Sequence, residues 1–204
     1  MRKNNGDTLR LFNGRDGEWL AAIDFTNKKQ ATAKPFEHFK QQPKNEPGIH
    51  LLFAPIKKSP MGFLIEKAVE LGVTDLHPVI TARTENRKVN TEKMQSHVTE
   101  AAEQCERLSV PKIHEARKLT PALQDWDTSL NIHWCAERME GTQNLNACKT
   151  ANAFLVGPEG GFDESENAYL QSLNFITPID LGEQILRAET AALYCLSHAK
   201  LCQK

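Results

Sequence analysis

From residue 49 onward, apolar runs of strand length alternate with helical patterns. Strands are expected at residues 49–56, 73–80, 110–113, 130–136, 153–156 and 175–181. Helices are expected from Ser59 to Gly72, over a stripe from Met94 to Leu108 that includes Cys105, from Thr120, from Asp163, and from 188 to 202. Strands that alternate with helices are typical of an α/β fold with a mostly parallel sheet.

The helix starts carry recognisable capping residues. Ser59 and Thr120 each precede a proline, and Thr91 stands at the head of the long stripe, so all three are expected to be N-caps. Asp163 is followed by Glu166 three residues later, which is the pattern of a capping box.

The first 34 residues have a different pattern. Leu9 and Leu11 alternate with polar residues, Asn13-Gly14 indicates a hairpin turn, and residues 19–25 alternate as a half-buried strand does. Residues 35–48 hold three prolines and a glycine among polar residues, which predicts a linker. Two domains are therefore expected, at residues 1–48 and 49–204.

Composition indicates an ordinary globular protein. Of the 204 residues, 40% are hydrophobic and 25% charged, and no window approaches the roughly 18 apolar residues of a membrane span. The five cysteines are scattered without a CxxC pair, which argues against a zinc site or disulfide framework and favours the cytoplasm.

Charge is unevenly distributed along the chain. Residues 1–50 carry nine Lys/Arg against six Asp/Glu, whereas residues 119–204 carry five against eleven. This asymmetry suits a protein that holds a polyanion through its first part, although an unevenly solvated surface explains it equally well.

The stretch with the strongest functional signal is Gly157-Pro-Glu-Gly-Gly161, between a predicted buried strand and a predicted helix. Glycine allows close approach of a ligand to the main chain. A phosphate loop is not expected, because no Lys-Ser/Thr follows the glycines and acidic residues surround them. An uncharged or cationic ligand fits better, and a purely structural turn is the alternative.

A second stretch, Ile179 to Ala191, ends another strand at Leu181-Gly182 and opens a helix at Arg187. Arginine at such a junction suits a phosphate or a base edge, although Arg187 and Glu189 could instead pair with each other. We expect the two stretches to meet and form one site.

Other polar residues have weaker signals. The basic run from Arg83 to Lys88 follows a strand and is either a phosphate-contacting loop or a solvated connection. His97, His114, His133 and His198 stand singly without metal-ligand spacing, so they are expected to be structural or exposed, and no metal site is predicted.

Two blocks of the sequence resemble the signature of a known family. They are Leu155-Val-Gly-Pro-Glu-Gly-Gly-Phe and Leu181-Gly-x-x-Ile-Leu-Arg-x-Glu-Thr-Ala-Ala, with further matches at Lys57, Glu66-Lys-Ala-x-Glu-Leu-Gly-Val, Arg83 and Glu100-Ala-Ala-Glu-Gln-Cys-x-Arg. The family is the RsmE-type 16S ribosomal RNA uridine-N3 methyltransferases of the SPOUT superfamily, and the similarity spans nearly the whole chain.

The resemblance implies a fold and partners. The second domain would be a SPOUT-type α/β domain with a deep C-terminal trefoil knot, and the first a small PUA-like, RNA-binding β-barrel. The enzyme would be a homodimer through the knot domain, acting on 16S rRNA of the small ribosomal subunit, with no metal and no membrane. Because the family pattern places a further strand or two before the Gly6-Asp7 turn, the first domain is expected to be incomplete at its N-terminus.

The resemblance also implies site residues. S-adenosyl-L-methionine would be held at Leu155, Val156, Gly157, Pro158, Glu159, Gly160, Gly161, Leu181, Gly182, Ile185, Leu186, Arg187, Thr190 and Ala191. RNA contacts are expected at Arg10, Arg15, Lys57, Arg83, Arg87 and Lys88. Arg187 and Glu189 are the catalytic candidates, Arg187 to orient the base and Glu189 to support Arg187 or the proton transfer. The alternatives are a methyltransferase for another RNA and a non-catalytic RNA-binding assembly protein.

Overall fold

The computed structural model describes residues 4–27, 30–44, 48–136, 139, 141–148 and 151–202. The chain forms two compact units, one made of residues 1–46 and 102–110, the other of residues 47–101 and 111–204. The sequence predicted a single boundary at residue 48, whereas the structure groups the nine residues from 102 to 110 with the N-terminal unit.

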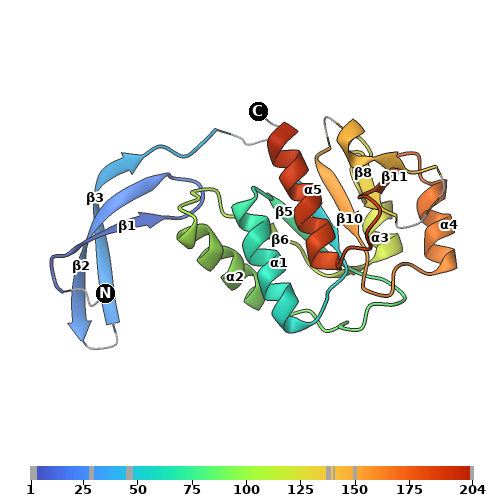
Figure 1. The fold of residues 1–204 in the computed structure, drawn as a ribbon. Coiled ribbons are helices and arrows are strands. Elements are labelled where there is room, and N and C mark those ends of the chain that lie inside the picture. Colours follow the sequence, from blue (N-terminus) through green and yellow to red (C-terminus); the bar gives the residue numbers. More distant parts are fainter. Residues whose placement is uncertain are drawn as a thin grey trace. The chain divides into compact units, whose positions relative to one another are not determined.

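The first unit contains an antiparallel sheet of β1 (Thr8–Phe12), β2 (Glu18–Asn27) and β3 (Gln30–Lys40), in that order (Figure 1). The sequence predicted a linker at residues 35–48. This is wrong for residues 35–40, because they belong to β3. The register slips between Leu20 and Ala21 of β2, where Pro35 is paired. A bulge of this kind on an outer strand tolerates a residue that lacks an N–H donor.

The second unit is built on a parallel sheet in the order β6-β5-β4-β10-β8-β11-β9, with β7 beside β5. Its strands are β4 (His50–Phe53), β5 (Asp75–Ile80), β6 (Lys112–Ile113), β7 (Arg117–Lys118), β8 (Ile132–Cys135), β9 (Gln143–Asn144), β10 (Ala153–Val156) and β11 (Ile176–Asp180). All of its strand pairs are parallel, as the alternation of strands and helices predicted.

Helices cover both faces of this sheet. They are α1 (Lys58–Glu70), α2 (Thr91–Gln104), α3 (Leu119–Gln124), α4 (Glu164–Ser172) and α5 (Ala188–Cys202), with a 3-10 turn at Leu145–Ala147. On one face, α1 and α5 lie side by side (Figure 1) and α5 packs on β10. On the other face, Leu123 of α3 and Leu170 of α4 share a buried cluster with Leu52 and Leu155 of the central strands. No helix within the described ranges is long and apolar enough to cross a membrane.

The predicted capping residues are only partly correct. The box is confirmed: Asp163 accepts from the backbone N–H of Glu166, whose side chain accepts from the backbone N–H of Asp163. Ser59, Thr91 and Thr120 are not caps, because each helix begins earlier than expected.

The N-caps of α1 and α3 are Lys57 and Lys118, and neither side chain bonds the helix. Ahead of α2, Asn90 Oδ1 accepts from the backbone N–H of Lys93. The sequence placed Cys105 in the apolar stripe of this helix, but α2 ends at Gln104 and Cys105 is exposed.

Candidate active site

A cavity of about 640 Å³ opens where β8, β10 and β11 end. Its volume lies within the range of pockets for small molecules, and the carboxyl ends of parallel strands are where α/β folds bind ligands. Both stretches singled out from the sequence line it: residues 156–161 at the end of β10 and beyond, and residues 179–188 at the end of β11 and beyond. The structure thus brings the two loops together around one space.

The first loop depends on glycine at Gly157. A Cβ there would lie 2.7 Å from the ring of Phe162, a side chain that is itself buried. The backbone N–H of Gly161 donates to the carbonyl of Pro158 at 2.8 Å, and Gly161 has φ +68°, a conformation that favours glycine. The loop is therefore a closed turn whose main chain faces the cavity.

The second loop turns at Gly182. Its φ is +118°, a Cβ there would meet no atom within 4 Å, and its N–H donates to the carboxylate of Asp180 at 3.2 Å. The carbonyl of Arg187 then accepts from the N–H of Ala191 at 2.9 Å, in the first turn of α5. The Arg187 side chain is exposed and lines the cavity at this junction.

A third wall comes from Arg83, which was expected to contact RNA. Its guanidinium donates to the carbonyl of Gly160 at 2.8 Å. The backbone N–H of Ala82 donates to Glu166 at 2.8 Å, so this loop is also tied to the start of α4. Arg83 therefore fixes the glycine loop as well as placing a positive charge at the cavity.

Three of the residues predicted for the cofactor or for catalysis do not line the cavity. Leu155 belongs to the buried cluster beneath the sheet, because alternate residues of β10 face opposite sides. Glu189 and Thr190 lie in the first turn of α5, half-buried and exposed respectively, outside the cavity lining. Every other residue predicted for the cofactor lines it.

The remaining basic candidates lie elsewhere. In the first unit, Arg10 pairs with Glu106 at 3.0 Å and Arg15 with the neighbouring Asp16 at 3.2 Å.

In the second unit, Lys57 lies 3.9 Å from Glu85, and both side chains are exposed. Arg87 donates to the carbonyls of Ala82 and Thr84, and Lys88 is exposed.

Sequence reasoning missed the floor of the cavity. Trp134 and Cys135, at the end of β8, line it, although the strand that carries them was predicted. The indole N–H of Trp134 is buried and has no partner among the described residues. The Cys135 and Cys195 sulfur atoms lie 3.5 Å apart. The hydrogen bond between these two thiols, and to a smaller extent burial, raises the pKa of the Cys195 thiol well above its ordinary value.

Acidic groups dominate the rim. Glu159, Asp180 and Glu183 line the cavity against two arginines. Close by, the backbone N–H of Glu166 holds the pKa of the Asp163 carboxyl below its ordinary value. A cavity with main-chain polar atoms and excess carboxylate suits a ligand that is polar and partly cationic.

Two family models match the chain. One, described as an RNA methyltransferase domain, matches residues 43–200, and another, an RNA methyltransferase PUA domain, matches residues 1–36. The first match covers more than half of the chain, including the residues that line the cavity, so the chain falls in a known class of RNA methyltransferases.

Individual relatives narrow the class. Ribosomal RNA small subunit methyltransferase E of Rickettsia conorii is 35% identical over 98% of this chain and 83% of its own length. A protein from Legionella pneumophila, solved with the bound cofactor S-adenosylmethionine, superposes with a TM-score of 0.83 at 27% identity, over 98% and 84% of the two chains.

Ribosomal RNA small subunit methyltransferase E from Neisseria gonorrhoeae, also solved with S-adenosylmethionine, gives a TM-score of 0.80 at 28% identity, over 95% and 82%. The chain belongs to the RNA methyltransferase family that contains the ribosomal RNA small subunit methyltransferases E.

Proposed function

We propose that this protein transfers the methyl group of S-adenosylmethionine to N3 of a specific uridine in the 16S rRNA of the small ribosomal subunit. The observation that carries the proposal is the single cavity lined by both glycine loops, residues 157–161 and 181–187, in a chain of this family. An rRNA substrate would place the enzyme in the cytoplasm.

The residues present fit this cofactor. S-adenosylmethionine carries a methyl group that is activated by a positively charged sulfur. Carboxylates of Glu159, Asp180 and Glu183 suit that charge, and the main chain at Gly161 and Gly182 is open to the polar edges of a nucleoside.

Arg187 would orient the uracil. It lines the cavity directly ahead of α5, whose N-terminus also favours negative charge. Its guanidinium can hold a base carbonyl or a phosphate so that N3 points into the cavity, and orientation of this kind lowers a barrier by several kcal/mol. Glu189 lies outside the cavity, so we assign it the support of Arg187 and not direct contact with the base.

The substrate uridine has to leave its RNA stack to reach the cavity. The first unit provides surfaces for flanking RNA, because Phe36 and Phe39 are exposed on β3 and the Arg10 guanidinium lies 5.8 Å from the centre of the Phe39 ring. Stacking on exposed aromatic rings and charge from arginine are how single strands are held. The family expectation of a PUA-like RNA-binding barrel and of RNA contacts at Arg15 belongs to the same proposal.

The trefoil knot and the homodimer also belong to the proposal. The knot follows from the family resemblance, and the contacts of α5 with α1 and β10 are compatible with it. A dimer through this domain is supported by large apolar side chains that α1 and α5 leave exposed, namely Phe63, Tyr194 and Leu201.

Calorimetry with S-adenosylmethionine tests whether the protein binds this cofactor. We expect binding at micromolar concentration. No heat of binding at millimolar ligand would favour a non-catalytic RNA-binding protein. Methyl transfer to purified small subunits and to transfer RNA, followed by nucleoside mass spectrometry, tests the substrate. Methylation of transfer RNA alone would favour the alternative substrate.

A further inference from the structure

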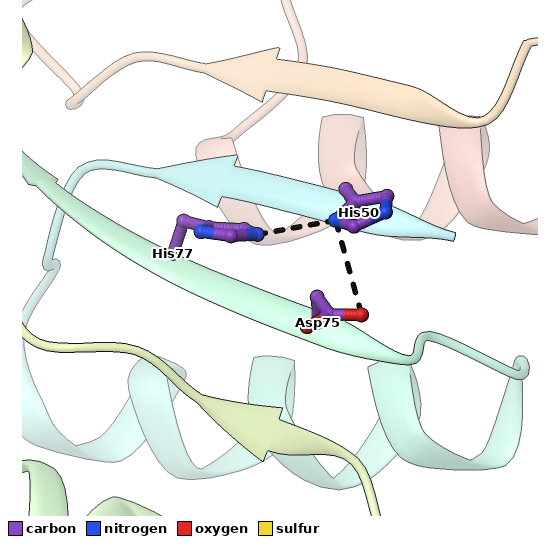
Figure 2. A group of neighbouring side chains, drawn as sticks. All are labelled: His50, Asp75 and His77. Carbon is purple, nitrogen blue, oxygen red and sulfur yellow. Dashed lines mark hydrogen bonds and ion pairs between the residues drawn. The ribbon is translucent and has the colours of Figure 1, made fainter. Parts of the chain in front are cut away.

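A second group of polar side chains lies at the opposite end of the parallel sheet from the cavity. His50 opens β4, Asp75 opens β5, and His77 follows two residues later. His50 pairs with Asp75 across the parallel ladder, and alternation along β5 puts Asp75 and His77 on one face. Figure 2 shows the three side chains pointing toward one another from the two strands.

The distances between their donor atoms suit one metal ion. His50 Nδ1 lies 3.2 Å from His77 Nε2 and 3.8 Å from Asp75 Oδ2. One donor atom from each residue lies within 4.8 Å of the other two. A tetrahedral zinc ion with bonds of about 2.0–2.1 Å separates two nitrogen ligands by about 3.3 Å, so the two imidazoles already stand at ligand separation.

Neighbouring groups hold these side chains in place. His114, which follows β6, has its Nε2 atom 2.7 Å from Asp75 Oδ1, and its ring stacks on His77 with centroids 4.0 Å apart. Trp126 meets the His50 and His77 rings edge-on, with centroids 5.6 and 5.3 Å away. One Asp75 oxygen is thus hydrogen-bonded while the other faces the histidines, which is how carboxylate ligands are oriented in metal sites.

We propose that His50, Asp75 and His77 bind a zinc ion or a similar divalent transition metal, with water in the fourth position. The His50 and Asp75 side chains are 19% and 25% exposed, so an ion reaches them from solvent. The ion would clip the amino ends of β4 and β5 together. The sequence predicted no metal site, because the ligands come from two strands that only the fold brings together.

The full chain, freed of metal with a chelator, is to be titrated with Co²⁺ and then Zn²⁺. We expect one equivalent to bind, with the visible absorption of a four-coordinate nitrogen and oxygen site and no thiolate charge-transfer band. Imidazole NMR signals of His50, His77 and His114 should shift, while those of His97 on α2 should not.

Variants assign the ligands. His50→Gln and His77→Gln should each weaken binding at least about 100-fold, and His114→Phe about 10–100-fold, which is the size of an outer-partner effect. His97→Gln removes an imidazole outside the cluster and should bind as the unaltered chain does.

No binding by the unaltered chain at millimolar Co²⁺ or Zn²⁺ would overturn the proposal and leave a simple hydrogen bond between His50 and His77. A thiolate band, or equal losses in His97→Gln and His77→Gln, would overturn it too. If His77→Gln does not fold, the cobalt spectrum and the NMR shifts of the unaltered chain still decide.

Discussion

Replacement of Gly157 by alanine tests whether the glycine loop is shaped by close packing. The added Cβ would lie 2.7 Å from one ring atom of Phe162 and 3.2 Å from two more, where carbon atoms normally rest about 3.5–4.0 Å apart. Gly157 does not have a positive φ, so alanine meets a collision and not backbone strain.

The Phe162 ring has little room to yield, because it is buried and packs edge-on against Trp134 with centroids 5.8 Å apart. We therefore expect Gly157→Ala to lower the free energy of unfolding by about 1–3 kcal/mol, the usual cost of overpacking. Because the loop moves instead of the ring, affinity for S-adenosylmethionine should fall about tenfold, which corresponds to about 1.4 kcal/mol.

Urea denaturation followed by circular dichroism measures the stability, and calorimetry measures the affinity. The matched control is Gly62→Ala in α1, where a Cβ meets nothing within 4 Å and helix propensity should raise stability by about 0.5–1 kcal/mol. Phe162→Leu in the Gly157→Ala background should recover part of the affinity. Unchanged stability and affinity in Gly157→Ala, or strictly additive effects in the double variant, would refute the reasoning.

Three further predictions address other parts of the second unit. Arg187→Ala should reduce the rate of methyl transfer about 100-fold while the affinity for the cofactor is retained, since the role of Arg187 is to orient the base. The control is Arg117→Ala, which removes an exposed arginine paired with Asp125. An equal loss of methyl-transfer rate in Arg117→Ala would contradict a specific role for Arg187. Asp163→Ala should lower the free energy of unfolding, measured by urea denaturation, by about 1 kcal/mol because the capping box is lost. Ser172→Ala, at the other end of α4, should change it by less than about 0.5 kcal/mol. Equal effects of the two variants would contradict the capping role of Asp163. Burial lowers the pKa of His77 to about 3, so protonation of this side chain favours the unfolded chain. With chelator present, the free energy of unfolding should therefore be highest above about pH 6.5 and should fall as the pH drops, by about 2 kcal/mol at pH 5. Denaturation of His77→Gln between pH 7.5 and 5 should show a flatter pH dependence, and an unchanged slope would contradict the role of His77.

Local sequence signals predicted much of the second unit. The run from Ala153 to Val156 and the Asp163 capping box are short-range features, and the structure has both where they were expected. The two glycine loops also line one cavity, because loops that follow neighbouring parallel strands open at the same edge.

Features that depend on strand pairing were beyond the sequence. The strand through Pro35 looked like a linker, since only its pairing with β2 and the bulge there make a proline acceptable. Leu155 was assigned to the cofactor, yet its side chain points into the core because side chains alternate between the two faces along β10. His50 and His77 come together only through the register of β4 against β5.

The central claim is methylation of a uridine in small-subunit rRNA, and nucleoside mass spectrometry of 16S rRNA from a strain that lacks this gene tests it most directly. We predict that N3-methyluridine disappears from the 16S rRNA and returns when the intact gene is restored. An unchanged content of N3-methyluridine in the deletion strain would contradict the account.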